Sequence, residues 1–593
     1  MNRRAQRVFS RVWPMLLVIL ATANASANAT ATANATVTAN ASANATATAN
    51  ATATKPAPGP WQVAPGRSAV RAASGMVASS QPLASRVGIE VLSRGGNAVD
   101  AAIAMAAVLA VVEPGMSGLG GDALALVYLA QRGEVKALNA TGRAPKAMTR
   151  AYFADKGTSK IPLTGWDSVT VPGAVAGWAA LRDAYGTRPL GELLAPAIAY
   201  AEQGFPVMEK SAADWAAFAS KLQADETART TLLIQGRAPL PGEILKQPLL
   251  AKTLRTLAAG GRDAFYKGAI AQAIAAHSHA HGGPLTLSDL AEYQAEWVTP
   301  LSTTYRDHRI FEAPPNSQGL TALLALNILE GFDLKKLSEQ PDAYYHTLIE
   351  ATKLAFADRD RYLGDPSTSA IPVAQLLSKE YAAQRRKLIA KDRAQPTVAP
   401  GALGPGDTSY VVVVDKDRNV VSYIGSLYMM LGSGVVAGQT GILLQDRAAS
   451  FSLDPKHPNC VQPRKRPAHT IMPALLTKDG KPVLALGVVG GDMQPQAQVQ
   501  VLSAVLDLGL PLQTALEAPR YLFQGGGEVV FEESVPAPVV ERLVARGHVA
   551  AKPKPPLTVR AAVGGVQAVR IDLEHHTLEG ASDPRKDGQA LGY

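Results

Sequence analysis

Apolar residues recur with a helical period where the globular sequence begins. Leu83, Val87 and Val91 lie four positions apart and form one stripe. Pro82 stands in the first turn, where proline is tolerated, and the pair Gly95-Gly96 follows the stripe. The pattern therefore predicts a helix that begins near this proline and ends at these glycines.

The next segment is apolar on every side and rich in alanine. Asn97 caps it, with Asp100 three residues further on. The run continues to Val112, and Pro114 stops it. Because alanine dominates the run and Asp100 and Glu113 bracket it, the composition argues against a membrane span. We predict a buried core helix.

Strand and helix patterns follow along the chain. Residues 124–129 and 135–138 predict a β-hairpin around a short polar turn. The pattern predicts a mainly helical region over residues 171–293 and a further helix over residues 342–363. Its charged residues are spaced for i,i+3 and i,i+4 pairs, which we interpret as structural. These residues are Glu350, Lys353, Asp358 and Arg359.

An uninterrupted apolar run follows Thr408 and predicts a strand that is buried on both faces. Residues 416–419 are polar turn residues, and residues 420–424 predict the returning strand of a hairpin. If the bond between Asp407 and Thr408 were cut, Thr408 would carry a free α-amine beside its hydroxyl, a nucleophile and a base in one residue. A threonine at the start of a strand is also ordinary β-propensity, so that alternative stays open.

Two other stretches bear on this chemistry. Residues 396–406 are rich in proline and glycine, predict an exposed linker suited to processing, and lead directly to Thr408. Gly490 and Gly491 follow a predicted strand at residues 483–486. Adjacent glycine amides can direct two N–H groups at one oxygen atom, as an oxyanion hole requires. A plain turn is the alternative.

The first 65 residues differ from the rest in composition. Four arginines precede an apolar run at residues 15–21, which is too short to span a bilayer, and small residues that suit signal cleavage follow. We predict a signal peptide over residues 1–23 and a periplasmic or secreted protein; an uncleaved anchor is the alternative. Residues 24–65 are rich in alanine, asparagine and threonine and predict a disordered leader.

Overall composition narrows the possible functions. With 593 residues, 47% of them hydrophobic and 18% charged, the chain can bury an ample core. The net charge is +9, but the lysines and arginines are scattered and form no binding motif. We therefore predict no nucleic-acid partner, and no membrane association after removal of the signal peptide.

Cysteine and histidine usage argues against a metal or a cofactor. Cys460 is the single cysteine, so no intrachain disulfide can form. His277, His279 and His281 alternate, and on a strand all three would face one side as metal ligands. They fall where a helix predicted over residues 269–276 ends in glycine and proline, so we predict neither a metal nor a cofactor.

Short motifs along the globular part match one known family in content and in order. They include Met76-Val77-Ala78-Ser79, Gly95-Gly96-Asn97-Ala98, Val112-Glu113-Pro114, Ser117-Gly118-Leu119-Gly120-Gly121, Val171-Pro172-Gly173-Ala174, Ala355-Phe356-Ala357-Asp358-Arg359, Gly432-Ser433-Gly434, Lys465-Arg466-Pro467 and Gly490-Gly491. With these motifs the chain resembles the γ-glutamyltransferase (glutathione hydrolase) family. So many ordered matches are far more specific than any one of them.

The resemblance implies an α+β fold, the αββα four-layer sandwich of the N-terminal-nucleophile hydrolases. It also implies a proprotein that cleaves itself between Asp407 and Thr408. The products would be a large subunit, residues 66–407, and a small catalytic subunit, residues 408–593, which pair and together form one domain.

The catalytic residues of the family have counterparts in this chain. Thr408 corresponds to the nucleophile, and Gly490 and Gly491 correspond to the glycines of the oxyanion hole. Ser426 stands where the family has a threonine that assists the nucleophile, so one hydroxyl replaces another.

The residues that hold the γ-glutamyl head in the family are replaced in this chain. The differences affect an arginine that binds the α-carboxylate, three residues at the α-amino end, and a tandem serine pair. The corresponding positions carry Thr141, with Arg143 two residues away, and Tyr428, Arg447, Ser450, His469 and Thr470. These departures resemble a divergent branch that is similar to the oxamate amidohydrolases.

We therefore predict a self-cleaving threonine amidohydrolase or acyltransferase that acts on a small-molecule amide through an acyl-threonine intermediate. The alternative substrates are carboxylate-bearing amides of the oxamate or glutaryl type, with Arg447, His469 and Arg143 as partners of the carboxylate. A non-catalytic binding protein that keeps only the fold is a further alternative. Retention of Thr408, Ser426 and both glycines favours the enzyme.

Overall fold

A computed structural model of the protein describes residues 66–395 and 407–593. The predicted signal peptide and leader, and the linker predicted over residues 396–406, lie outside the described residues. In the part of the chain that is described, no helix is long and apolar enough to cross a bilayer.

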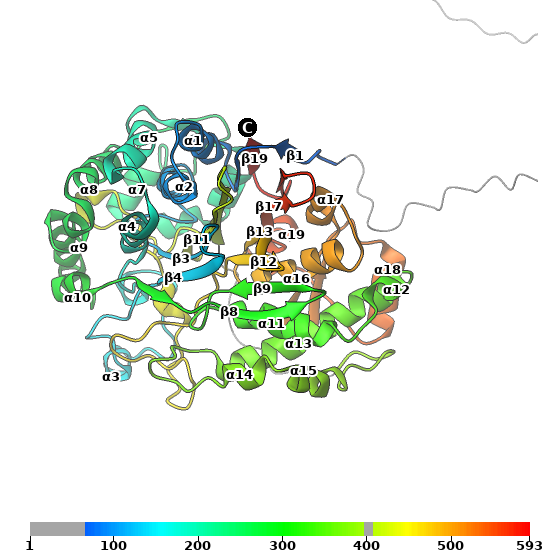
Figure 1. The fold of residues 1–593 in the computed structure, drawn as a ribbon. Helices are drawn as coiled ribbons and strands as arrows, with labels where there is room; N and C mark the ends of the chain where they lie inside the picture. The colour runs from blue at the N-terminus through cyan, green and yellow to red at the C-terminus, as the bar shows by residue number, and fades with distance from the viewer. Residues whose placement is uncertain (1–65, 396–406) are drawn as a thin grey trace, which may run out of the picture. The chain divides into compact units, whose positions relative to one another are not determined.

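Most of the described strands form two antiparallel sheets of seven strands each, which Figure 1 shows between helices. The first sheet has the order β1 (Val70–Ala72), β18 (Thr577–Ser582), β17 (Gly565–Asp572), β13 (Lys481–Val489), β12 (Ala474–Lys478), β9 (His308–Glu312) and β8 (Leu301–Tyr305). The second has the order β19 (Gln589–Gly592), β2 (Met76–Ser79), β10 (Asp407–Val414), β11 (Val420–Tyr428), β3 (Asp122–Leu129), β4 (Glu134–Ala140) and β7 (Glu296–Val298). Each sheet therefore contains strands from both sides of the predicted cleavage point.

One helical layer packs on the second sheet, with α2 against β10 and β11. The Asn97 side chain accepts the N–H groups of Val99 and Asp100, and Asp100 accepts the N–H of Asn97, so the predicted cap is a full capping box. Every residue of α2 is buried, as its alanine-rich composition predicts. The layer comprises α1 (Pro82–Ser93), α2 (Ala98–Val112), α4 (Ala174–Tyr185), α5 (Leu190–Gln203), α8 (Pro248–Tyr266) and α9 (Ala269–Ala280).

A second helical layer covers the first sheet, with α16 on β13 and α11 on β8. It comprises α11 (Gly319–Leu329), α13 (Pro341–Tyr362), α16 (Met493–Leu506), α17 (Leu512–Glu517) and α18 (Ala537–Ala545). A small sheet of β14 (Tyr521–Gly525), β15 (Glu528–Phe531) and β16 (Val549–Ala550) lies beside it. The shorter elements are α3 (Arg150–Asp155), α6 (Glu209–Phe218), α7 (Glu226–Leu232), α10 (Leu287–Glu292), α12 (Leu334–Leu337), α14 (Val373–Leu376), α15 (Lys379–Arg386), α19 (Val559–Ala562), β5 (Phe205–Pro206) and β6 (Ile244–Leu245).

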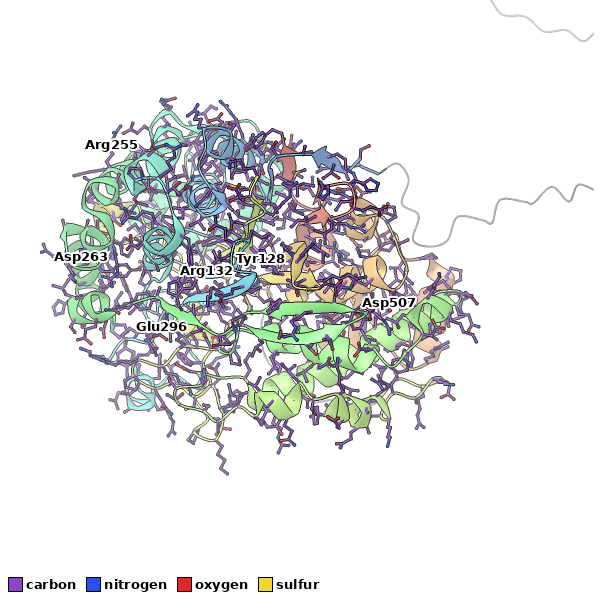
Figure 2. The ribbon with its side chains drawn as sticks, in the orientation of Figure 1. Tyr128, Arg132, Arg255, Asp263, Glu296 and Asp507 are labelled. Carbon is purple, nitrogen blue, oxygen red and sulfur yellow. The ribbon has the colours of Figure 1, made fainter. Side chains whose placement is uncertain are left out.

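The two sheets pack face to face, which completes the predicted αββα sandwich. Along β10, Val411 and Val413 belong to the core under α2, whereas Val412 and Val414 belong to the core between the sheets. Tyr128 of β3 lies between the layers in Figure 2, and its hydroxyl donates to the carbonyl of Gly480 at 3.0 Å. The same figure shows charged side chains such as Arg255 on the outer side of α8.

Three local predictions need correction or refinement. The helix predicted over residues 269–276 continues to Ala280 as α9, so it includes His277 and His279, and the rings of His277 and His281 lie with centroids 4.1 Å apart. The returning strand β11 extends four residues past the predicted end, to Tyr428. In α13, Glu350 and Lys353 form a predicted pair at 2.8 Å, but Arg359 pairs with its neighbour Asp360 and with Asp492, not at i,i+3 or i,i+4 spacing.

Candidate active site

Thr408 lies near the start of β10 and is fully buried. The pairing of β10 with β11 shifts between Asp407 and Ser409, so the strand is irregular at this residue. The Thr408 hydroxyl donates to Ser426 Oγ at 3.4 Å and accepts from Gln494 Nε2 at 3.3 Å. Two elements of different layers therefore meet at this hydroxyl: β11 and the first turn of α16.

Ser426 connects the Thr408 hydroxyl to the next group of residues. Its Oγ accepts the backbone N–H of Tyr428 at 2.8 Å and a guanidinium N–H of Arg447 at 3.3 Å. Since Ser426 is fully buried on a regular strand, these contacts hold its hydroxyl in one orientation beside Thr408. The structure thus brings together the predicted nucleophile and its predicted assistant.

Gly490 and Gly491 form the turn between β13 and α16. Their φ angles are 127° and 56°, which are strained for other residues, and a Cβ on Gly490 would lie 3.1 Å from the Cα of Gly564. Their carbonyls accept the N–H groups of Met493 and Gln494, which start the helix. Within the described residues, the N–H groups of both glycines have no acceptor. Amides of this kind at a helix N-terminus suit a developing oxyanion.

Arg447 is a buried cation whose contacts are to neutral groups. Its guanidinium donates to Thr470 Oγ1 at 3.1 Å and to Ser426, and its centre lies 4.1 Å from the centroid of the Tyr428 ring. No carboxylate of the described residues lies within ion-pair distance of it, and its Nε, also buried, has no partner there. Burial lowers the pKa of Arg447 to about 10. A fully buried guanidinium of this kind is ready to receive an anion.

His469 lies beside this arginine but is held by Asp122. His469 Nε2 is 3.0 Å from Asp122 Oδ2, and its Nδ1 accepts the N–H of Ile471 at 3.3 Å. Burial and the charge of Arg447 hold the pKa of His469 well below its usual value, so the ring is neutral and donates from Nε2. Burial raises the pKa of Asp122 to about 7. His469 therefore orders the site and adds no charge to it.

Thr141 and Ser450 are also buried and hydrogen-bonded within the protein. The Thr141 hydroxyl donates to Asn139 Oδ1 at 2.6 Å and accepts from Asn316 Nδ2 at 3.2 Å. Ser450 Oγ donates to the carbonyls of Arg447 at 2.9 Å and Ala468 at 3.0 Å. Neither position supplies a charge for a zwitterionic ligand.

Arg143 does not join this group. Its guanidinium lies 2.8 Å from Glu296 Oε1 and 3.6 Å from Asp365 Oδ2, and it donates to the carbonyl of Arg464 at 2.9 Å. Its side chain is 27% exposed, in contrast to the buried Arg447. The structure therefore places Arg143 in a partly exposed ion-pair cluster.

Sequence reasoning missed two glutamines that hold the site together. Gln494 contacts Thr408, as described above. Gln318 Nε2 donates to the carbonyls of Thr470 at 2.7 Å and Gly491 at 3.0 Å, and its Oε1 accepts from Arg359 at 3.0 Å. A sequence signal existed for Gln494, because it lies three residues after the glycine pair. Gln318 follows no motif that points to the site.

A buried cluster of His346, Glu350 and His548 offers three ligand atoms of the kind that bind metals. Its hydrogen bonds account for these atoms. His346 Nε2 is 2.8 Å from the carbonyl of Ala390, and its Nδ1 is 2.8 Å from His548 Nε2. The ammonium of Lys353 lies 2.8 Å from Glu350 Oε1 and would repel a cation. We interpret the cluster as structural.

A mostly apolar pocket reaches the site at Gly490. Its lining includes Phe218, Met430, Leu557 and Ala562, and the ion pair of Arg560 and Asp214 lies at its side. A small organic group could therefore approach the glycine turn through this pocket.

Comparison with known proteins agrees with this geometry. The family model described as gamma-glutamyltranspeptidase matches residues 84–593. The chain is 41% identical over 527 residues to the glutathione hydrolase-like YwrD proenzyme of Bacillus subtilis, covering 87% of this chain and 98% of that protein. It is 37% identical over 535 residues to the oxamate amidohydrolase proenzyme of Klebsiella pneumoniae, covering 88% and 98%.

A solved structure shows the same fold over nearly its whole length. The crystal structure of cephalosporin acylase from Bacillus halodurans superposes with a TM-score of 0.84 at 43% sequence identity. The match covers 89% of this chain and 97% of that protein. The named relatives thus include an amidohydrolase proenzyme and an acylase.

Proposed function

The chain belongs to the gamma-glutamyltranspeptidase family of self-processed amide hydrolases, and we propose that it acts on amides whose acyl group carries a carboxylate but no amine. In this proposal Thr408 is the nucleophile and Arg447 binds the carboxylate. The observation that carries it is the buried Arg447 guanidinium, which donates to Ser426 beside the nucleophile and has no carboxylate partner among the described residues.

Processing would use the Thr408 hydroxyl within the uncut chain. Its oxygen attacks the carbonyl carbon of Asp407, the C–N bond breaks, and the acyl group moves from nitrogen to oxygen. The nitrogen takes the proton that the hydroxyl gives up and becomes the α-amine of Thr408. Water then hydrolyses the ester, which leaves a carboxyl end at Asp407 and a free hydroxyl on Thr408. The hydrogen bond from this hydroxyl to Ser426 supports the proposal.

Turnover would repeat this chemistry on a substrate amide. The α-amine of Thr408 accepts the hydroxyl proton while the oxygen attacks the substrate carbonyl. The N–H groups of Gly490 and Gly491 stabilise the oxyanion, and the amine product leaves with a proton. Water then cleaves the acyl ester and regenerates Thr408.

The charge pattern argues against a γ-glutamyl acyl group as the best donor. Such a group carries an ammonium beside its carboxylate, and a buried ammonium needs an anion or several acceptors. Arg447 puts a positive charge at this end of the site, and Tyr428 and Ser450 offer no carboxylate. An acyl group with the carboxylate alone, of the oxalyl or glutaryl type, fits the same groups without this repulsion.

A γ-glutamyl donor is the second candidate, because several relatives are named glutathione hydrolases, as is the proenzyme of Escherichia coli at 36% identity. Three p-nitroanilides separate the candidates. Glutaryl-p-nitroanilide differs from the γ-glutamyl compound only in lacking the amine, and valeryl-p-nitroanilide lacks the carboxylate as well. We expect kcat/KM to be highest for the glutaryl compound, by roughly tenfold or more. A preference for the γ-glutamyl compound would overturn the proposed substrate class.

We also propose that the protein is exported. This rests on the arginine-rich start and the short apolar run of residues 1–23. Cell fractionation with mass spectrometry of the mature N-terminus tests it. A cytoplasmic protein that keeps its first 23 residues would contradict it.

A further inference from the structure

We infer that Gln494 is a further catalytic residue, which donates a hydrogen bond to the Thr408 oxygen while that oxygen attacks and leaves the acyl carbon. The inference rests on the proposed role of Thr408 as the nucleophile. Its geometric basis is the 3.3 Å contact from Gln494 Nε2 to Thr408 Oγ1, both fully buried.

The orientation of the Gln494 amide follows from its second contact. Its Oε1 accepts the backbone N–H of Met472 at 3.1 Å. A backbone N–H can only donate, so the carbonyl end of the amide must face Met472 and the NH₂ end must face Thr408. One turn later, Gln498 Nε2 donates to the carbonyl of Met472 at 3.1 Å. Gln494 and Gln498 of α16 therefore bind the backbone N–H and the backbone carbonyl of Met472, which holds the Gln494 side-chain amide in one orientation.

Gln494 also ties the nucleophile to the glycine turn. Its backbone N–H donates to the carbonyl of Gly491 at 3.1 Å, in the first turn of α16. The same few residues thus supply the N–H groups for the oxyanion and the side-chain donor for the Thr408 oxygen. Their relative position is set by one helix start and does not depend on a mobile loop.

The N–H donor has a defined task in the two chemical steps. During attack the Gln494 N–H occupies one lone pair of the Thr408 oxygen and leaves the other for the acyl carbon, while the α-amine takes the hydroxyl proton. During deacylation, the bond between the acyl carbon and the Thr408 oxygen breaks, and the electron pair goes to that oxygen. The Gln494 N–H stabilises this charge until the α-ammonium of Thr408 returns a proton. We therefore expect its loss to slow deacylation most.

The test compares Gln494→Leu and Gln494→Glu with the matched control Gln496→Leu. Gln496 lies on the same helix, is equally buried, and hydrogen-bonds both the N–H and the carbonyl of Phe523. We expect Gln494→Leu to lower kcat on glutaryl-p-nitroanilide by roughly tenfold or more, with a larger burst of p-nitroaniline than the unmodified enzyme shows. Gln496→Leu should keep kcat and the burst unchanged, whatever it does to the melting temperature.

The Gln494→Glu variant adds a pH readout that a packing role would not produce. A carboxylate can still accept from Met472, but it donates to Thr408 only when it is protonated. The kcat of this variant, divided by that of the unmodified enzyme at the same pH, should therefore rise as pH falls. A ratio that does not change with pH, or unchanged kcat and burst in Gln494→Leu, would refute the inference.

Thr408→Ala separates this inference from the proposed function. If Thr408→Ala is processed or active, the nucleophile assignment fails, and the role of Gln494 fails with it. If Thr408→Ala is uncut and inactive while Gln494→Leu behaves like the control, only the role of Gln494 is wrong.

Discussion

Two buried arginine sites in this protein have opposite surroundings. Arg585 lies among carboxylates, with Glu532 at 2.6 Å and Asp583 at 3.1 Å, and Arg520 binds the other side of Asp583 at 2.6 Å. Arg447 is buried to a similar degree, yet its contacts are hydroxyls and the ring of Tyr428. Burial lowers the pKa of Arg447, whereas at Arg585 the nearby carboxylates outweigh burial and raise the pKa.

This difference separates a structural cation from one that is available to a ligand. Burying a charge is costly, and carboxylate partners offset that cost at Arg585. Arg447, which lies next to the proposed nucleophile, has no carboxylate partner among the described residues, so the cost of burying its charge is only partly offset. An incoming carboxylate would supply the missing partner, which is why we assign the substrate's carboxylate to this arginine.

The largest effect should come from the paired site. Arg585→Met leaves the buried carboxylate of Asp583 and the partly buried carboxylate of Glu532 with fewer partners, so we expect the free energy of unfolding to fall by about 3–5 kcal/mol. Urea denaturation in the Thr408→Ala background, which should keep the chain in one piece, measures it. Arg447→Met in the same background is the control and should be neutral or stabilising. Equal losses in the two variants would contradict the comparison.

Two buried carboxyl groups, Glu113 and Asp583, should differ in the same way, and the difference should appear in how stability depends on pH. Glu113 accepts from the hydroxyls of Ser80 and Ser409, and burial raises its pKa to about 7. Because folding raises its pKa, the protonated Glu113 carboxyl stabilises the folded state below about pH 4.5. This stabilisation is lost as the pH rises through 7. Glu113→Gln lacks this dependence, so its stability relative to the parent should increase by up to about 3 kcal/mol from pH 4.5 to 8.

For Asp583 we expect the opposite dependence of stability on pH. Burial raises its pKa, but Arg520 and Arg585 outweigh that and lower it overall. Its contribution is therefore present at neutral pH and is lost as pH falls below the usual aspartate range. Paired urea titrations over the pH series test the Glu113 prediction. If Glu113→Gln and its parent change in parallel with pH, that prediction is wrong.

A somewhat smaller effect is expected on activity at the unpaired site. Arg447→Met should lower kcat/KM for glutaryl-p-nitroanilide by roughly a hundredfold, because a buried charge-pair partner is lost. The value for valeryl-p-nitroanilide, which has no carboxylate, should change much less. Steady-state kinetics of both substrates gives the ratio. If both fall equally, Arg447 supports the site without recognising the carboxylate.

The smallest effect should come from a paired arginine at the surface. Arg255 binds Glu202 at 2.6 Å on the outside of α8, with its side chain 60% exposed. Water and salt screen such a pair, so Arg255→Ala should leave both activity and the urea midpoint almost unchanged. A loss comparable to that of Arg585→Met would show that pairing rather than burial decides the effect.

Much of the fold was predictable because local patterns and the tertiary structure agree. The Asn97 cap, the alanine-rich helix that follows it and the strand after Thr408 all have the predicted form. The helix predicted to end at residue 276 is too short, because α9 continues through the histidine tract to Ala280. The glycines and the proline that indicate its end stand a few residues further on, so they mark the end of the helix only approximately.

The site was only partly predictable. The resemblance pointed to Thr408, Ser426 and the glycine pair, which lie in motifs or at matched positions. Gln318 could not be found in this way, since its role depends on contacts with residues more than 150 positions away. The difference between Arg447 and Arg143 also needed the structure, because sequence spacing does not say which guanidinium is buried next to Thr408.

The most direct test of the account is intact-mass spectrometry of the purified protein, quenched with acid during turnover of glutaryl-p-nitroanilide. We predict two chains without any added protease, the smaller beginning at Thr408. A fraction of the smaller chain should be heavier by one glutaryl group, and fragmentation should locate that group on Thr408. A single uncut chain, a smaller chain with another first residue, or an acyl group on another side chain would contradict the central claim.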